Sequence, residues 1–176
     1  VPNPYHSSLK QIGAATQSNS ILLVHSRSLS HGSLAHQHLI QLLLKLPEEW
    51  ELVVRFHPNE RTEGRRYYSA LLSDTDLKGC RVKISLDEHQ NDQLIFALRR
   101  APVVVGPSSA ALTEAWVAGR RVIYLAWRNE LDERYGQSPN VMSMDNAAQK
   151  AQVERFLATS AVDDEDERRR VDQIAS

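Results

Sequence analysis

Short apolar runs alternate with longer amphipathic stretches from residue 20 onward. Five runs have the length and composition of buried strands, at 21–24, 52–56, 82–84, 102–105 and 122–125. Apolar residues recur at helical spacing at 33–46, 62–74, 90–100, 110–118 and about 146–160. This alternation predicts an α/β fold, a Rossmann-like open parallel sheet of about five to six strands with helices on both faces. We expect the strand order 3-2-1-4-5.

The two ends of the chain differ from its middle. Residues 1–19 are polar with two early prolines, which predicts a linker or an arm. Residues 20–162 carry the pattern of strands and helices, and the mixed-charge run at 163–176 predicts a charged helix or tail. The length of 176 residues suits one folded domain. Because the chain begins with Val1, we expect it to be a processed or excised piece.

Composition narrows the class of partner and the compartment. The chain has 21 Lys and Arg against 22 Asp and Glu, a net charge of −1, which gives no reason to expect a nucleic-acid partner. The single cysteine, Cys80, excludes an intramolecular disulfide and fits a reducing compartment. No apolar run approaches the roughly 20 residues that span a bilayer. We therefore expect a cytoplasmic protein without a transmembrane segment.

Polar residues that follow the strands are the candidates for a binding site, because ligands of open α/β sheets bind beyond the carboxyl ends of the strands. Ser108 and Ser109 follow the fourth strand and begin a helix, where free N–H groups favour an anion. Glu114 lies farther along that helix, within reach of the ribose of a nucleotide whose phosphate sits at the helix start. The alternatives are a simple helix cap and a surface glutamate.

Two other strand ends carry donors. His57 and Pro58 follow the second strand, where an imidazole could bind a phosphate or assist a leaving group; the alternative is a histidine that bonds a nearby loop. Ser26 and Arg27 follow the first strand. The GxGxxG and GxxxxGK[ST] patterns are absent from the sequence, which excludes the classical dinucleotide and P-loop classes.

The sequence gives no metal or nucleophile site. His36 and His38 fall on different faces of their helix and His31 lies in a loop, so we expect solvated histidines and no metal ion. Cys80 has no second cysteine near it, and no GxSxG pattern occurs, which argues against an α/β-hydrolase.

Two of these segments resemble motifs of a known family. Residues 54–58, Val-Arg-Phe-His-Pro, resemble the HP motif of bacterial GT-B glycosyltransferases. Residues 105–115, Val-Gly-Pro-Ser-Ser-Ala-Ala-Leu-Thr-Glu-Ala, resemble their Ser-Ser/Thr motif. The patterns are most similar to those of sialyl-, polysialyl- and capsule-polysaccharide transferases. The resemblance covers about residues 20–126 and implies half of a GT-B fold, the half that binds the nucleotide-sugar donor.

The resemblance also implies roles for individual residues. His57 would stabilise the phosphate of a CMP-activated sugar as it leaves, a catalytic role, with Pro58 as its motif partner. Ser108 and Ser109 would donate to that phosphate, and Glu114 would accept from the ribose. The chain is also similar to enzymes that use UDP-sugars, such as UDP-N-acetylglucosamine 2-epimerase, so the resemblance does not decide between cytosine and uracil as the nucleobase of the donor. No metal or other cofactor is implied.

The same resemblance places the nucleobase of the donor beside the third strand, where the backbone of Ile84 and Ser85 would face it. It assigns the catalytic base and the saccharide acceptor to an N-terminal domain that this chain lacks. We therefore expect a chain that binds a nucleotide sugar, transfers no sugar by itself, and works in the cytoplasm or at the periphery of the inner membrane. The alternatives are a CDP-glycerol glycerophosphotransferase-like domain and a non-catalytic nucleotide-binding module.

Overall fold

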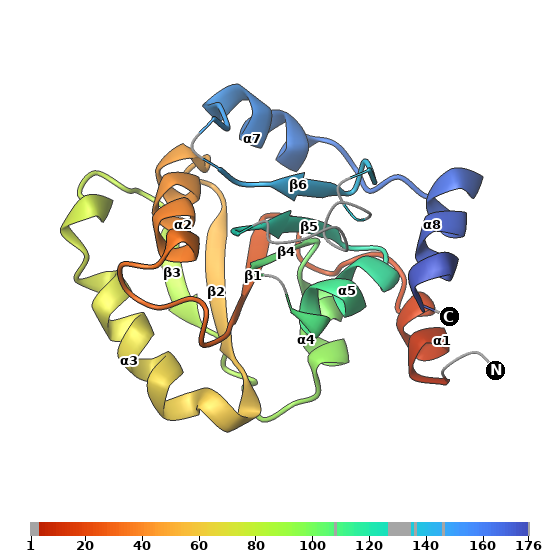
Figure 1. Ribbon diagram of the computed structural model, residues 1–176, viewed down its shortest axis with the longest axis horizontal. Helices are drawn as coiled ribbons and strands as arrows, with labels where there is room; N and C mark the ends of the chain where they lie inside the picture. The colour runs from red at the N-terminus through yellow and green to blue at the C-terminus, as the bar shows by residue number, and fades with distance from the viewer. Residues whose placement is uncertain (1–3, 108, 127–134, 136, 146, 176) are drawn as a thin grey trace.

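The structure is a computed structural model, which describes residues 4–107, 109–126, 135, 137–145 and 147–175. Its elements are drawn in Figure 1. In chain order they are α1 (Pro4–Lys10), β1 (Ser20–His25), α2 (Leu34–Lys45), β2 (Glu51–Phe56), η1 (Pro58–Glu60), α3 (Arg61–Leu72), η2 (Thr75–Leu77), β3 (Lys83–Leu86), α4 (Leu94–Arg100), β4 (Val103–Gly106), α5 (Ala110–Val117), β5 (Arg121–Tyr124), β6 (Val141–Ser143), α7 (Lys150–Ala158) and α8 (Glu165–Ala175).

The described strands form one parallel sheet with the order β3-β2-β1-β4-β5-β6. The order of the first five strands confirms the prediction. The sixth, β6, adds an edge strand of three residues, which is too short to show an alternating pattern in the sequence. The chain runs outward from β1 to β3 and then returns to place β4 on the other side of β1. The switch point of the sheet therefore lies between β1 and β4.

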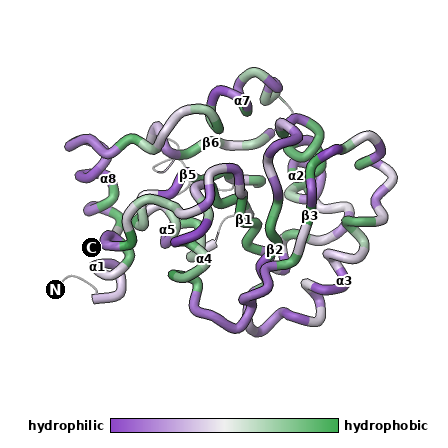
Figure 2. Tube along the Cα trace, turned by 180° about the vertical axis from the view of Figure 1, so that it is seen from behind, coloured by the Kyte–Doolittle hydropathy of each residue, from purple (hydrophilic) through white to green (hydrophobic). Residues whose placement is uncertain are grey.

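Helices cover both faces of the sheet, as predicted. On one face, β1 and β5 pack against α2, α3 and α7 through a cluster that includes Leu23, Leu42 and Ile123. On the other face, β1, β4 and β5 pack against α1, α4 and α5 through Leu22, Val104 and Trp116. Figure 2 shows hydrophobic residues gathered along the central strands, while α3 and α8 are mostly hydrophilic. None of the described helices is long and apolar enough to cross a bilayer.

Two glycines allow close backbone packing near the strand ends. A Cβ on Gly106, the last residue of β4, would lie 2.8 Å from Val24 Cγ2 and 3.0 Å from the Val24 carbonyl oxygen. A Cβ on Gly64 in α3 would lie 2.4 Å from Cδ1 of Phe56 at the end of β2. These contacts bring β4 against β1 at the switch point and α3 against β2. The approach depends on the missing side chain.

The first segment of the chain, expected as a linker or an arm, contains a short helix. Residues 4–10 form α1, and its Leu9 is fully buried against the second face of the sheet. Lys10 pairs with Asp172 of α8, and α1 and α8 lie on the same side of the molecule (Figure 1). A helix with a single buried residue has no apolar period, so the sequence alone did not show it.

Candidate functional site

The junction between β4 and α5 holds an unused hydroxyl. Ser109 is the N-cap residue of α5, with extended backbone, but its side chain makes no capping hydrogen bond. Its Oγ is buried and has no hydrogen-bond partner among the described residues. A buried polar atom without a partner costs about 1–3 kcal/mol and calls for an explanation such as a ligand. Ser108 lies outside the described residues.

Glu114 lies one turn farther along α5 and is half-buried. Its Oε2 accepts a hydrogen bond of 2.9 Å from the hydroxyl of Tyr5 in α1. Burial, together with the hydrogen bond and charge of Glu114, raises the pKa of Tyr5 to about 12, so the phenol keeps its proton at neutral pH. Glu114, which is expected to bind the ribose, therefore already accepts one hydrogen bond from α1.

His57 is held by its own backbone neighbour. It is the N-cap residue of η1, and Nδ1 accepts a hydrogen bond of 3.2 Å from the backbone N–H of Asn59. Pro58 occupies the first position of η1 and has no N–H that would need a partner. Because Nδ1 accepts, the proton of the neutral imidazole is on Nε2. The exposed ring of His57 can thus donate from Nε2 to an anion at this edge.

The loop after β1 is tied to the start of α3. Nε of Arg27 lies 3.4 Å from a carboxylate oxygen of Glu60 and 3.6 Å from one of Glu63, and its side chain is 75% exposed. Ser26 Oγ lies 2.9 Å from Ser28 Oγ. Exposed pairs of this kind contribute little to stability. The two carboxylates do offset the charge of Arg27, so a phosphate at this loop would compete with Glu60 and Glu63 for the guanidinium. Neither glutamate was predicted from the sequence as a partner of Arg27.

The third strand ends later than predicted. Ile84 and Ser85 lie within β3 rather than after it, and Ser85 is in register with Val53 of β2. The carbonyl oxygen of Ile84 accepts a hydrogen bond of 3.3 Å from the hydroxyl of Tyr68. The backbone expected to face the base is therefore engaged within the sheet. The carboxyl edge of β3 begins at Asp87.

Asp87 is part of a buried ion-pair network rather than an exposed carboxylate. Its Oδ2 lies 2.9 Å from Nη1 of Arg55, and its Oδ1 lies 3.2 Å from Nη2 of Arg100. Oδ1 also accepts the backbone N–H of His89 at 3.0 Å. The carbonyl oxygens of His89 and Asp92 accept from Arg55 as well. The network fixes the loop before α4, which begins at Leu94 rather than at residue 90. A charged Arg55 within an apolar strand was the signal for a buried carboxylate partner.

The prediction of solvated histidines on α2 is wrong. His36 and His38 are only 5% and 6% exposed. Nδ1 of His36 lies 2.7 Å from the hydroxyl of Tyr67 in α3, and Nδ1 of His38 bonds the carbonyl oxygen of Leu125 after β5. The two rings are buried on different sides of α2, His36 against α3 and His38 against the segment after β5. His36 also lies close to His31 and to Asp74, the residue before η2, a grouping that no spacing in the sequence indicated.

A further cavity among the described residues lies at the opposite end of the sheet. It has a volume of about 850 Å³ and is lined by the segment at 13–18, by Arg120 and Asn140 before β5 and β6, and by Glu167 of α8. Glu167 is already bonded to the indole N–H of Trp116 at 2.7 Å and to Asn140 at 3.0 Å. Because ligands of such sheets bind at the carboxyl ends of strands, we place the candidate site at the other edge.

Comparison with known proteins shows the fold. No protein-family model matches the sequence, and no curated protein matches it. The UDP-GlcNAc 2-epimerase of Methanocaldococcus jannaschii has a TM-score of 0.52 at 12% identity over 90% of this chain and 44% of that chain. S. aureus MnaA, in a structure with UDP, has 0.52 at 17% identity over 97% and 46%. The Neisseria meningitidis UDP-GlcNAc 2-epimerase bound to UDP-GlcNAc has 0.50 at 17% over 88% and 40%.

The chain therefore spans less than half the length of each of these structures. At this identity the likeness concerns the arrangement of strands and helices, and the sialyltransferase type stays a prediction. The described sheet, its strand order and these neighbours together show that the chain folds as a Rossmann-like domain of the GT-B-like kind.

Proposed function

We propose that this domain binds the nucleotide part of a nucleotide sugar at the carboxyl edge of its sheet. The observation that carries the proposal is the hydroxyl of Ser109 at the start of α5, next to the switch point between β1 and β4; it is buried and has no hydrogen-bond partner among the described residues. A phosphate there would accept from that hydroxyl and from the free N–H groups of the first turn of α5. The hydroxyl would then have the partner that it lacks within the described protein.

His57 and Glu114 would hold the two sides of the nucleotide. β2 and β4 flank β1, so the residues that follow them share one edge of the sheet. Nε2 of His57 would donate to the phosphate as negative charge develops on the leaving nucleotide. Glu114, one turn into α5, would accept from the ribose hydroxyls while Tyr5 holds its carboxylate in place.

The base is proposed to be a pyrimidine. The HP and Ser-Ser patterns favour cytidine, whereas the structural neighbours named above were solved with UDP or UDP-GlcNAc. The sheet edge beyond β3 begins at Asp87, whose carboxylate is occupied by two arginines. We therefore expect contacts to the base from backbone groups of the 87–92 loop and test uridine and cytidine side by side.

The reaction that this site would serve is glycosyl transfer, with the domain as the donor-binding half. Of the acidic groups after β2 and β3, Asp87 is held by two arginines, and Glu60 has Oε1 3.4 Å from Nε of Arg27 and Oε2 buried without a hydrogen-bond partner among the described residues. A general base must reach the acceptor hydroxyl within hydrogen-bond distance. We therefore assign that base to another part of the enzyme and expect the 176-residue chain alone to bind donor without transferring sugar.

Calorimetric titration with UDP, UDP-GlcNAc, CMP and CDP, with NAD and ATP for comparison, tests the proposal. We expect a pyrimidine nucleotide to bind most tightly. Ser109→Ala and Glu114→Gln should each weaken binding by about 10- to 100-fold, the value of a hydrogen bond to a charged group. Ser109→Ala should leave the stability of the chain unchanged or raised, because it removes a buried hydroxyl that has no described partner.

Glu154→Gln is the matched control, a partly exposed glutamate on α7 that pairs only with Lys150 among the described residues. Its affinity should equal that of the unaltered chain. Tighter binding of NAD than of any pyrimidine nucleotide, or unchanged affinity in both Ser109→Ala and Glu114→Gln, would overturn the proposal.

A further inference from the structure

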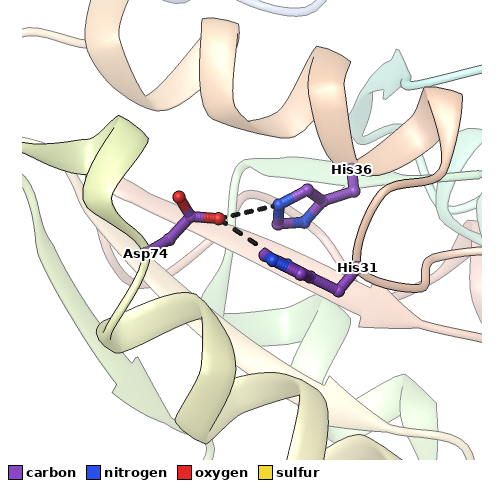
Figure 3. Close-up of side chains that lie close together, drawn as sticks. All are labelled: His31, His36 and Asp74. Carbon is purple, nitrogen blue, oxygen red and sulfur yellow. Dashed lines mark hydrogen bonds and ion pairs between the residues drawn. The ribbon is translucent and has the colours of Figure 1, made fainter.

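Three side chains that are distant in the sequence converge beside the loop after β1. His31 lies in that loop, His36 in the first turn of α2, and Asp74 directly before η2 (Figure 3). His36 Nε2 lies 2.9 Å and His31 Nδ1 lies 3.7 Å from the same oxygen, Oδ2 of Asp74. All three atoms lie within 4.8 Å of one another. They are the one such group of three metal-ligating side chains in the part of the chain that the structure describes.

The backbone holds two of these side chains in fixed positions. Asp74 is the N-cap residue of η2, and its Oδ1 accepts the backbone N–H of Asp76 at 2.9 Å, which leaves Oδ2 for the histidines. The Asp74 and His36 side chains are only 5% and 6% exposed. His36 follows the N-cap Ser33, whose hydroxyl accepts the His36 backbone N–H at 3.1 Å.

His31 comes from a loop with its own anchors. Leu29 is buried in the core, and its N–H donates to the Ser26 carbonyl oxygen at 2.9 Å. Gly32 follows His31 with a φ of +83°, a left-handed turn that suits glycine. The His31 side chain is 61% exposed, so the group is open to solvent on this side. The cluster therefore has two buried ligands and one that can adjust.

We propose that His31, His36 and Asp74 bind a divalent transition-metal ion of the zinc class. Zinc bonds of about 2.0–2.2 Å in tetrahedral geometry separate ligand atoms by about 3.4 Å, which lies between the 2.9 and 3.7 Å seen here. The three ligand atoms lie within 4.8 Å of one another, so the exposed His31 ring would have to turn to bring its nitrogen to that separation from both other atoms. Two imidazoles and one carboxylate favour zinc, cobalt or nickel over magnesium and calcium, which take oxygen ligands.

Tyr67 supplies the outer contact that such a site requires. A metal-bound histidine donates its other ring N–H to a neighbour, which orients the ring. With Nε2 of His36 on the ion, Nδ1 carries the proton and donates to the Tyr67 hydroxyl, 2.7 Å away. Tyr67 is thus a positioning residue. The ion would fix the loop of residues 26–33 to α2 and η2.

Titration of the chelator-treated 176-residue chain with Zn²⁺, without nucleotide, tests the proposal, and Co²⁺ absorption reports the ligand set. We expect one ion per chain and a Co²⁺ spectrum of four-coordinate, nitrogen-containing ligation. His31→Ala should reduce the affinity for Zn²⁺ by at least about 10-fold, and Tyr67→Phe by about 10- to 100-fold with the same stoichiometry. Circular dichroism should show native folding in His31→Ala, because that side chain is exposed.

His89→Ala is the matched control. His89 Nδ1 also lies 3.7 Å from an aspartate oxygen, of Asp92, but this pair belongs to no described group of three. Its affinity for Zn²⁺ should equal that of the unaltered chain. Equal Zn²⁺ binding by the unaltered chain and His31→Ala, or Co²⁺ bound without nitrogen ligation, would overturn the metal site. Because no nucleotide is present, such a failure leaves the proposed nucleotide site untouched.

Discussion

Replacing Asp87 by alanine separates a structural carboxylate from a catalytic one. In the structure Asp87 joins Arg55 of β2 to Arg100 of α4 and fixes the loop between β3 and α4. The Asp87 and Arg55 side chains are 4% and 7% exposed, so both charges are buried. We therefore expect Asp87→Ala to lower the free energy of unfolding, which the loss of a purely catalytic carboxylate would leave nearly unchanged.

The magnitude follows from what Arg55 would lose. Removing one partner of a buried ion pair costs about 3–5 kcal/mol, because the other charge stays buried without compensation. Arg55 would keep the carbonyl oxygens of His89 and Asp92 as acceptors, and Arg100 is partly exposed. Both facts place the expected loss at the low end, at about 3 kcal/mol. This is a large share of the roughly 5–15 kcal/mol that stabilises a domain.

Urea unfolding followed by circular dichroism measures this loss. With an m-value of about 2 kcal/mol/M, the midpoint should fall by about 1.5 M. Asp92→Ala is the control, since the contact of its side chain with a described residue is an exposed pair with His89, and the change should alter the stability by less than about 0.5 kcal/mol. A loss below about 1 kcal/mol for Asp87→Ala would refute the reasoning and make Asp87 a candidate for a general base.

Three further changes test the packing and the charges. Gly64→Ala should lower stability by about 1–2 kcal/mol in urea unfolding despite its better helix propensity, because a Cβ would lie 2.4 Å from Phe56; a stabilised variant would contradict that contact. Burial lowers the pKa of His25, although nearby carboxylates oppose the shift. The neutral His25 therefore contributes fully to the stability of the fold above pH 6.5, and this contribution is lost as the pH falls through the pKa of His25 in the folded state. His25→Phe should therefore flatten the acid limb of a pH–stability curve, and an unchanged limb would count against it. In a spectrophotometric titration Tyr5 should ionise near pH 12, and its pKa should shift part of the way toward 10 in Glu114→Gln. The stabilisation from the Tyr5–Glu114 contact is therefore complete below pH 10 and is lost as the pH rises toward 12. An unchanged pKa in Glu114→Gln would show that Glu114 does not act on Tyr5.

The sequence by itself determined the class of fold and the edge at which the candidate site lies. Apolar runs of strand length, separated by helical periods, suffice to predict a parallel sheet covered on both faces, since each period reflects which side of a local element is buried. Gly106 and Ser109 follow the strongest apolar run, and His57 ends another. Such local features persist in the structure, where α5 begins one residue after Ser109 and His57 is the N-cap of η1.

Only the tertiary structure decided which of these residues have partners. The Ser109 hydroxyl is buried and has no hydrogen-bond partner among the residues that the structure describes, which no spacing in the sequence shows. Arg55 meets Asp87 across 32 positions of the chain, and His36 meets Asp74 across 38. These contacts depend on how β3 registers with β2 and how α2 packs beside α3 and η2. The hydrophobic period of a helix or strand shows which side of it is buried but not which neighbour buries it. Contacts between residues so far apart in the sequence are set by the packing of the whole domain.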